Sequence, residues 1–230
     1  MQLELRSVVE AILYIVVTGS QWMNLPSDFP HPKSVYYHFR KWSRNGVWQR
    51  INRALGFLHR RQSGRFARPS AGILDSQSVK TTDSGKERGY DGHKKVKGRK
   101  RHVLVDTLGN LLEVVVLAAN TTDVAGAKAV LTKAERQITM RLLKLWADKG
   151  YQGEFSVWLA EQFDIQLDIV SAAADQTGFA VQPRRWVVER TFAWLGKHRR
   201  LSKDYERTPL SSEAMIYLAS IRTLLKRLAP

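Results

Sequence analysis

Three acidic residues stand in local contexts that suit metal-dependent phosphoryl transfer. Asp75 directly follows the short apolar run 71–74, and Asp148 directly follows the apolar run 142–147. Glu189 lies inside an amphipathic stretch with helical spacing. Two strand ends and a helix can direct three carboxylates to one point, where two divalent ions could drive an in-line displacement at a phosphodiester. Asp75, Asp148 and Glu189 are therefore the predicted catalytic residues and the predicted metal ligands.

Each of these positions also has an ordinary structural explanation. An aspartate after an apolar strand is often a turn or cap residue, and Glu189 can form an i,i+4 surface pair with Arg185. Asp106 is the strongest competing acid because it ends an expected strand, although a hairpin turn at Gly109-Asn110 explains it adequately. On spacing alone, both explanations stay open for the three acids.

The expected cofactor follows from the donor type. Magnesium prefers oxygen ligands and keeps several waters, and the substrate phosphate supplies further oxygens, so two or three carboxylates suffice for two ions. We therefore expect two Mg²⁺ ions, with Mn²⁺ able to substitute. The chain has no cysteine, which excludes disulfides, zinc–cysteine sites and thiol catalysis.

The charge balance points to a polyanionic partner. The 230 residues include 37 Lys and Arg against 21 Asp and Glu, a net charge of +16. Such a charge favours nucleic acid over a small neutral substrate. A merely solubilising surface is the alternative, but the basic residues are clustered, mainly within 86–101 and 184–207.

The first basic cluster alternates lysines and arginines with glycines. This composition is typical of a flexible arm that contacts phosphates without recognising bases. The predicted DNA contacts in this arm are Lys94, Lys95, Lys97, Arg99 and Lys100.

The second cluster surrounds Glu189. In a helix, Arg185, Glu189 and Arg200 would share one stripe with only small residues between them, which would let a phosphate backbone approach closely. Arg185, Lys197 and Arg200 are therefore predicted to hold phosphates. Tyr151, beside Asp148, is predicted to stack on an unpaired base.

The order of periodic segments predicts the fold. Residues 1–62 have helical periodicity, 63–70 form a polar linker, and 71–230 alternate strands with helices. Three consecutive strands followed by alternating helices and strands predict a mixed five-stranded sheet flanked by helices, as in the ribonuclease H-like fold. The expected strands are 71–74, 101–107, 111–118, 142–147 and 167–170.

The helical segment 1–62 has two explanations that the sequence leaves open. Its basic residues and three expected short helices suit a small DNA-binding head of the helix-turn-helix kind. It could equally be a cap that only buries apolar surface. The most apolar stretch, 8–17, contains Glu10 and is too short to span a bilayer, so we expect an intracellular protein without membrane association.

Four motifs together resemble bacterial insertion-sequence transposases of the IS-five group, within the IS-four/IS-five superfamily, which belong to the DDE class. They are LDSQSVKTT at 74–82, GRKRHVLVDTLG at 98–109, WADKGY at 146–151 and RRWVVERTFAWL at 184–195. The resemblance extends from about residue 12 to residue 228. It implies a ribonuclease H-like catalytic domain with Asp75, Asp148 and Glu189 as the acidic triad.

The chain departs from that family pattern at two positions. Gln182 stands where a tyrosine is expected, and Gly196 stands where a lysine is expected, with Lys197 one place late. The departures affect the roles of this motif in handling the terminal phosphate and a hairpin, and leave the triad intact. Family members usually carry an upstream stretch, so the resemblance also implies an N-terminally shortened head.

The resemblance implies a transposase that cleaves double-stranded DNA at the ends of its element and joins the freed 3′ hydroxyls to target DNA. A homodimer is expected, because two ends must be paired. Two alternatives stay open: a related nuclease without strand transfer, and an inactive or domesticated relative that only binds DNA.

Overall fold

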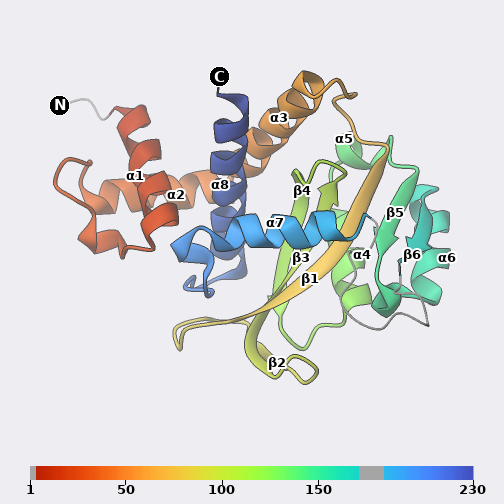
Figure 1. Cartoon of the computed structure of the whole chain (residues 1–230). Coiled ribbons are helices and arrows are strands. Elements are labelled where there is room, and N and C mark those ends of the chain that lie inside the picture. The colour runs from red at the N-terminus through yellow and green to blue at the C-terminus, as the bar shows by residue number, and fades with distance from the viewer. Residues whose placement is uncertain (1–3, 171–183, 230) are drawn as a thin grey trace.

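The computed structural model describes residues 4–170 and 184–229. Helices form the first part of the chain, and all lie within 5–62 (Figure 1). They are α1 (Leu5–Thr18), the short 3-10 helix η1 (Trp22–Asn24), α2 (Pro32–Arg44) and α3 (Val47–Gln62).

Six strands and the remaining helices follow. The strands are β1 (Ala71–Lys80), β2 (Gly89–Asp91), β3 (Val96–Asp106), β4 (Leu111–Ala118), β5 (Lys144–Ala147) and β6 (Gln166–Ile169). The helices are α4 (Asp123–Lys133), α5 (Arg136–Thr139), η2 (Lys149–Tyr151), α6 (Glu154–Phe163), α7 (Trp186–Gly196), η3 (Arg199–Leu201) and α8 (Pro209–Leu228).

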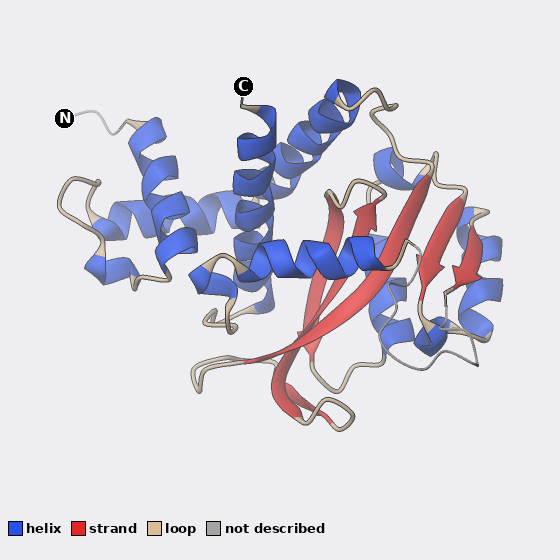
Figure 2. Cartoon of the chain, in the orientation of Figure 1, coloured by secondary structure: helices blue, strands red, loops and turns tan. Residues whose placement is uncertain are grey.

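The strands form one mixed sheet, drawn in red in Figure 2. β3 pairs antiparallel with β1 on one side and with β4 and β2 on the other. β5 pairs parallel with β1, and β6 pairs parallel with β5. An antiparallel meander extended by parallel crossover strands confirms the predicted ribonuclease H-like arrangement, with six strands in the described residues instead of five.

The additional strand length comes from the polar, glycine-containing segments. β1 continues to Lys80 although its apolar run ends at Leu74, because its backbone stays paired with β3 as far as the Lys80–Gly98 pair. A Cβ at Gly98 would lie 2.0 Å from the carbonyl oxygen of Val79, so only glycine permits this close approach. The predicted flexible arm at 86–101 is therefore largely part of the sheet. Whether this segment forms strands depends on pairing with neighbouring strands and not on its own side-chain pattern.

Alternating residues of the strands pack on opposite faces of the sheet. Ile73, Val103 and Val105 face a core formed with α7, α8 and the helices of 5–62. Leu74 and Leu104 face a second core formed with α4, α5 and α6. The result is a three-layer arrangement of helices, sheet and helices (Figure 1).

The helices of 5–62 share the larger core with α8 and the sheet. Phe39 and Trp48 are buried in it, and Asn52 donates to the backbone oxygen of Leu111 in β4 at 2.8 Å. The division into a 1–62 head, a 63–70 linker and a 71–230 catalytic domain stays a prediction. Among the helices of the described ranges, none combines the length and apolar character that crossing a membrane requires.

Candidate active site

Asp75 and Asp148 lie side by side on neighbouring parallel strands. Ile73 of β1 pairs with Trp146 of β5, so Asp75 and Asp148 each stand two residues beyond that pair. Asp75 is within β1, whereas Asp148 directly follows β5, where its side chain caps η2 by accepting from the backbone N–H of Gly150 at 2.9 Å. The sequence-predicted pair of aspartates therefore meets at one edge of the parallel part of the sheet.

The carboxyl group of Asp75 is held in an unfavourable position for a charge. Burial raises its pKa to about 6, and the neighbouring carboxylate of Asp148 adds to the rise. The backbone N–H of Ser76, which donates to Asp75 at 2.7 Å, and the guanidinium of Arg185 lower it. The nearby positive charges do not compensate for the desolvation, so the pKa of Asp75 stays raised, and a carboxyl group with a raised pKa is typical of a functional site.

Glu189 is in the first turn of α7 and forms an ion pair with Arg185. The distance from Arg185 Nη2 to Glu189 Oε1 is 3.0 Å, and both side chains are partly exposed. Arg185 also acts electrostatically on Asp75, so its guanidinium links the α7 acid to the strand acids. In the described ranges no three His, Asp or Glu side chains are grouped so that they could hold one metal ion, so Asp75, Asp148 and Glu189 do not form a closed ligand set in this structure.

A fourth acid, which is not among the residues predicted from the sequence, lies at this edge. Asp123, the first residue of α4, accepts from the Ser76 hydroxyl at 2.7 Å and pairs with Lys100 at 3.3 Å. A Cβ at Gly150 would lie 3.1 Å from an Asp148 oxygen and 3.6 Å from an Asp123 oxygen, which places both acids beside that glycine. The only sequence signal for Asp123 was its place after Thr122, which caps α4.

Asp106, the competing acid, has a structural role. It is fully buried, pairs with Arg60 at 2.8 Å, and accepts from the backbone N–H groups of Leu108 and Asn110. These bonds shape the β3–β4 turn, in which Gly109 has φ +81. The turn explanation of Asp106 is therefore confirmed.

Four of the predicted DNA contacts are buried instead. Tyr151 is 2% exposed and packs against Phe155, so it is part of the wall beneath the acids and cannot stack on a base in this arrangement. Burial and the surrounding carboxylates of Asp75, Asp123 and Asp148 raise its pKa well above the ordinary value. Its hydroxyl therefore stays protonated and can donate a hydrogen bond.

Arg99, Lys100 and Arg200 are also internal, which corrects their prediction as phosphate contacts. Lys100 lies between Asp91 and Asp123, at 3.6 and 3.3 Å. Arg200 pairs with Glu206 at 2.8 Å. The stripe from Arg185 to Arg200 does not exist, because α7 ends at Gly196 and Arg200 belongs to η3.

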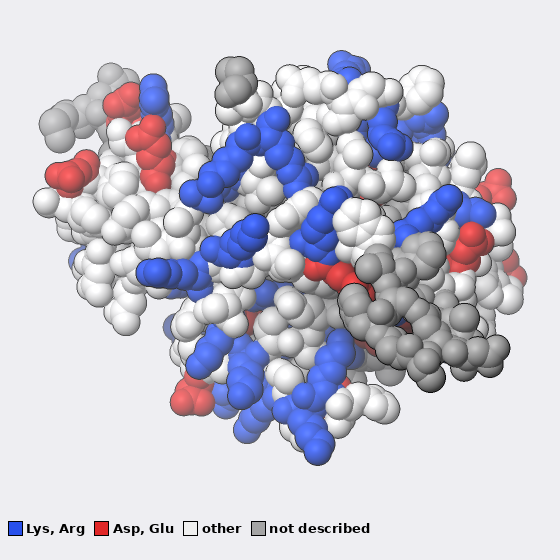
Figure 3. All heavy atoms as spheres, viewed as in Figure 1, with Lys and Arg blue, Asp and Glu red and all other residues white. Residues whose placement is uncertain are grey.

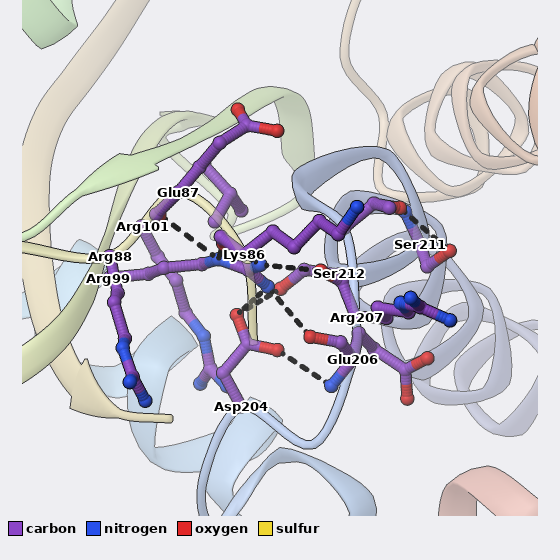
Figure 4. A network of polar contacts seen from close by, with 12 residues as sticks. Lys86, Glu87, Arg88, Arg99, Arg101, Asp204, Glu206, Arg207, Ser211 and Ser212 are labelled. Carbon is purple, nitrogen blue, oxygen red and sulfur yellow. Dashed lines mark hydrogen bonds and ion pairs between the residues drawn. The ribbon is translucent and has the colours of Figure 1, made fainter. Parts of the chain in front are cut away.

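Arg99 is the centre of a polar network that we call the Arg99 network, formed by Arg99, Asp204, Glu206 and Ser212 (Figure 4). Its guanidinium pairs with Asp204 at 3.2 Å and donates to the backbone oxygens of Lys86, Glu206 and Arg207. Asp204 also accepts from the Ser212 hydroxyl at 2.7 Å. The network fastens the segment before β2 and the segment before α8 to β3.

Five predicted DNA contacts remain at or near the surface. Lys94, Lys95, Lys97 and Lys197 are exposed, and Arg185 is partly exposed. Asp91 holds the tip between β2 and β3 by accepting from the backbone N–H groups of His93 and Lys94. In Figure 3, Lys and Arg side chains gather over α7, α8 and this tip, around a small acidic patch beside α7. Gln182, the altered tyrosine position, lies outside the described residues.

Two family models match the chain. "Transposase DDE domain" matches residues 67–225, and "Putative transposase of IS4/5 family" matches residues 2–52. A curated protein from Burkholderia cepacia, "Putative transposase for insertion sequence element IS402", is 29% identical over 116 residues. That alignment covers 48% of this chain and 54% of the relative, so the chain spans about half the length of the curated relative it matches.

Among solved structures, the Mos1 transposase paired-end complex with left transposon end is 13% identical with a TM-score of 0.31, covering 95% of this chain and 75% of that one. The Mos1 strand transfer complex has a TM-score of 0.29 at 13% identity, covering 95% and 74%. Because these TM-scores are low, the fold assignment rests on the strand order and not on these structures. The first family model spans more than half of the chain and includes all three predicted acids, and the chain therefore belongs to the transposase DDE domain family.

Proposed function

We propose that this protein is a DNA transposase that cleaves double-stranded DNA at the ends of an insertion sequence and transfers the strand to target DNA. The observation that carries the proposal is the position of Asp75 and Asp148, each two residues beyond the Ile73–Trp146 pair of the parallel strands β1 and β5, with Asp75 desolvated and close to a like charge. Family membership supports the same reaction class. We place this activity in the bacterial cytoplasm, at the nucleoid.

The residues at the site suit divalent ions, which transposases of this class use. The donors are carboxylate oxygens, the type that Mg²⁺ and Mn²⁺ prefer. Desolvation, with a smaller contribution from the carboxylate of Asp148, raises the pKa of Asp75, and a bound cation would stabilise its charged form. Asp75, Asp148 and Glu189 would hold the ions, once the Glu189 carboxylate exchanges Arg185 for metal.

Bound divalent ions would supply an activated hydroxyl nucleophile and charge stabilisation at the leaving 3′ oxygen. The chain itself orients the substrate. Arg185, released from Glu189, can grip a phosphate of the cleaved strand. Lys94, Lys95 and Lys97 at the β2–β3 tip and Lys197 after α7 can neutralise flanking phosphates.

Tyr151 positions the acids rather than the DNA. Its ring fills the space between the sheet and α6, and its hydroxyl lies among the carboxylates of Asp75, Asp123 and Asp148. A neutral phenol there can donate to one carboxylate without adding charge. A homodimer is part of the proposal, because transposition must act on both ends of one element.

The test uses a supercoiled plasmid that carries the gene with its natural flanking DNA, incubated with the full chain and Mg²⁺ or Mn²⁺. We expect nicks at the element ends and joined product when target DNA is added. Glu189→Gln should abolish both while DNA binding in a gel shift is retained. Nicks without joined product would identify a nuclease, and binding without nicks a DNA-binding relative; either result would contradict the proposal.

A further inference from the structure

A second basic surface lies where α3 passes into β1. An open cavity of about 780 Å³ is lined there by Arg61, Arg65, Arg68 and Arg141 together with Phe57 and Phe66. We call it the arginine–phenylalanine pocket. None of its residues belongs to the acidic site or to the predicted DNA contacts. In Figure 3, Lys and Arg side chains are visible over this corner of the molecule.

The pocket is held in shape by buried contacts. Arg60, which is almost fully buried and paired with Asp106, donates from Nε to the backbone oxygen of Phe66 at 2.8 Å. Arg141 donates to the backbone oxygen of Arg68 at 2.8 Å, and its guanidinium lies 4.2 Å from the centre of the Phe66 ring. The polar segment 63–70 is therefore fixed in place although its side chains face solvent.

The composition of the pocket indicates its ligand. Four arginines line it without an acidic residue, and in the described part of the chain none of the four forms an ion pair. Phe66 is 74% exposed between them. Unpaired guanidiniums around an exposed aromatic ring complement the phosphates and base or sugar faces of nucleic acid.

The position of the pocket suits the DNA proposed to reach the acids. β1 begins at Ala71, next to the pocket, and Asp75 is four residues further, about 13 Å at 3.3 Å per residue. One turn of DNA is about 34 Å long. One duplex can therefore lie on the acidic site and reach the junction within a single turn.

We propose that the arginine–phenylalanine pocket binds the backbone of the DNA segment flanking the cleaved phosphodiester. This inference rests on the proposed function for the identity of that DNA. The pocket adds affinity and fixes the direction of the duplex, and it takes no part in the cleavage chemistry.

The test measures DNA binding separately from cleavage. A fluorescent duplex of about four helical turns is titrated with the full chain by anisotropy, without divalent metal and over a series of salt concentrations. The variants are Arg65→Ala, Arg61→Ala/Arg65→Ala and Phe66→Ala. Arg6→Ala is the matched control, since Arg6 is an exposed arginine on α1. Far-ultraviolet circular dichroism and thermal melting verify that each variant is folded.

We expect Arg65→Ala to weaken binding several-fold and to reduce the slope of log affinity against log salt by about 0.9, the value for one lost phosphate contact. The double variant should lose about twice that slope. Phe66→Ala should weaken binding with an unchanged slope, because no charge is removed. Arg6→Ala should leave both quantities unchanged.

Equal DNA affinity of Arg65→Ala, the double variant and the control would contradict the proposal that the pocket binds DNA. So would a change in self-association, measured by sedimentation, with DNA binding intact, because the pocket would then be a protein interface. Plasmid nicking separates the two proposals. If these variants nick the plasmid normally and bind DNA as well as the unmodified chain, only the proposal for the pocket is contradicted. If the unmodified chain does not nick the plasmid, only the proposed transposase function is contradicted.

Discussion

The acidic site and the Arg99 network treat charge in opposite ways. Asp75 is buried beside another carboxylate, and its pKa is raised to about 6. Asp204 is more fully buried, yet it pairs with Arg99 and accepts from the Ser212 hydroxyl and the backbone N–H of Glu206. A satisfied buried charge fixes the architecture, whereas an under-compensated one remains available for a ligand.

The same substitution at the two places should separate these roles most sharply. Asp75→Asn removes an oxygen ligand, so cleavage should fall by about three orders of magnitude or more, equivalent to about 4 kcal/mol in the barrier. The variant should be as stable as the unmodified chain or more so, because the buried charge disfavours the fold at neutral pH. Plasmid nicking and chemical denaturation at pH 7 measure the two effects. Normal nicking would remove Asp75 from the reaction.

Asp204→Asn should do the reverse to stability. It leaves Arg99 buried without its ionic partner, and breaking a buried pair costs about 3–5 kcal/mol. Asp83→Asn is the matched control, since Asp83 is exposed and lies 3.7 Å from Arg88, where an ion pair contributes about 0–1 kcal/mol. Urea denaturation followed by circular dichroism compares the free energies of unfolding. Equal values for the two variants would show that the Arg99 network is not a structural fastening.

A buried histidine near the site, His102, should make the free energy of unfolding depend on pH. Burial lowers the pKa of His102 to about 4, and neither ring nitrogen has a hydrogen-bond partner among the described residues. The folded state therefore resists protonation that the unfolded state accepts, so stability is full above about pH 6.5 and falls as the pH drops toward 4. At pH 5 the loss should be about 2 kcal/mol.

The measurement is the difference between the unmodified chain and His102→Leu, in free energies of unfolding at pH 7 and pH 5. Asp75 acts in the opposite direction, because its raised pKa favours the folded state as the pH falls, and the subtraction removes it. The unmodified chain should lose about 2 kcal/mol more than the variant between the two pH values. Equal losses would mean that His102 is protonated in the folded protein.

The sequence predicted what depends on periodicity and failed where pairing decides. Strand alternation and order were enough for the mixed sheet, and the apolar run before Asp148 correctly placed that acid at a strand end. The prediction that Asp75 ends its strand was wrong, because β1 continues to Lys80. The pattern could not show that Gly98 lets β1 and β3 continue, because that depends on a partner strand. The missed strand β2 has only three residues and depends on the same pairing.

Arg99 and Lys94 illustrate the corresponding limit for the site. Both lie in one basic run, yet Arg99 is inside the Arg99 network and Lys94 is exposed. Composition favours phosphate binding for both, because the acids that neutralise Arg99 come from a segment about a hundred residues later. Glu189 stays a prediction as a metal ligand, since its present partner is Arg185.

That pair gives the smallest expected effect, and it tests whether Arg185 competes with the cation. Arg185→Ala frees the Glu189 carboxylate from an i,i+4 ion pair worth about 0.3–0.5 kcal/mol. Mn²⁺ should then bind about twofold more tightly in the absence of DNA, as measured by electron paramagnetic resonance of the free ion. Arg6→Ala is the matched control, because it breaks an equivalent pair with Glu10 at 2.9 Å on α1 and should leave Mn²⁺ binding unchanged. Weaker binding by Arg185→Ala would mean that its guanidinium holds the carboxylates of Asp75 and Glu189 near each other, so that its positive charge assembles the site rather than occupying it.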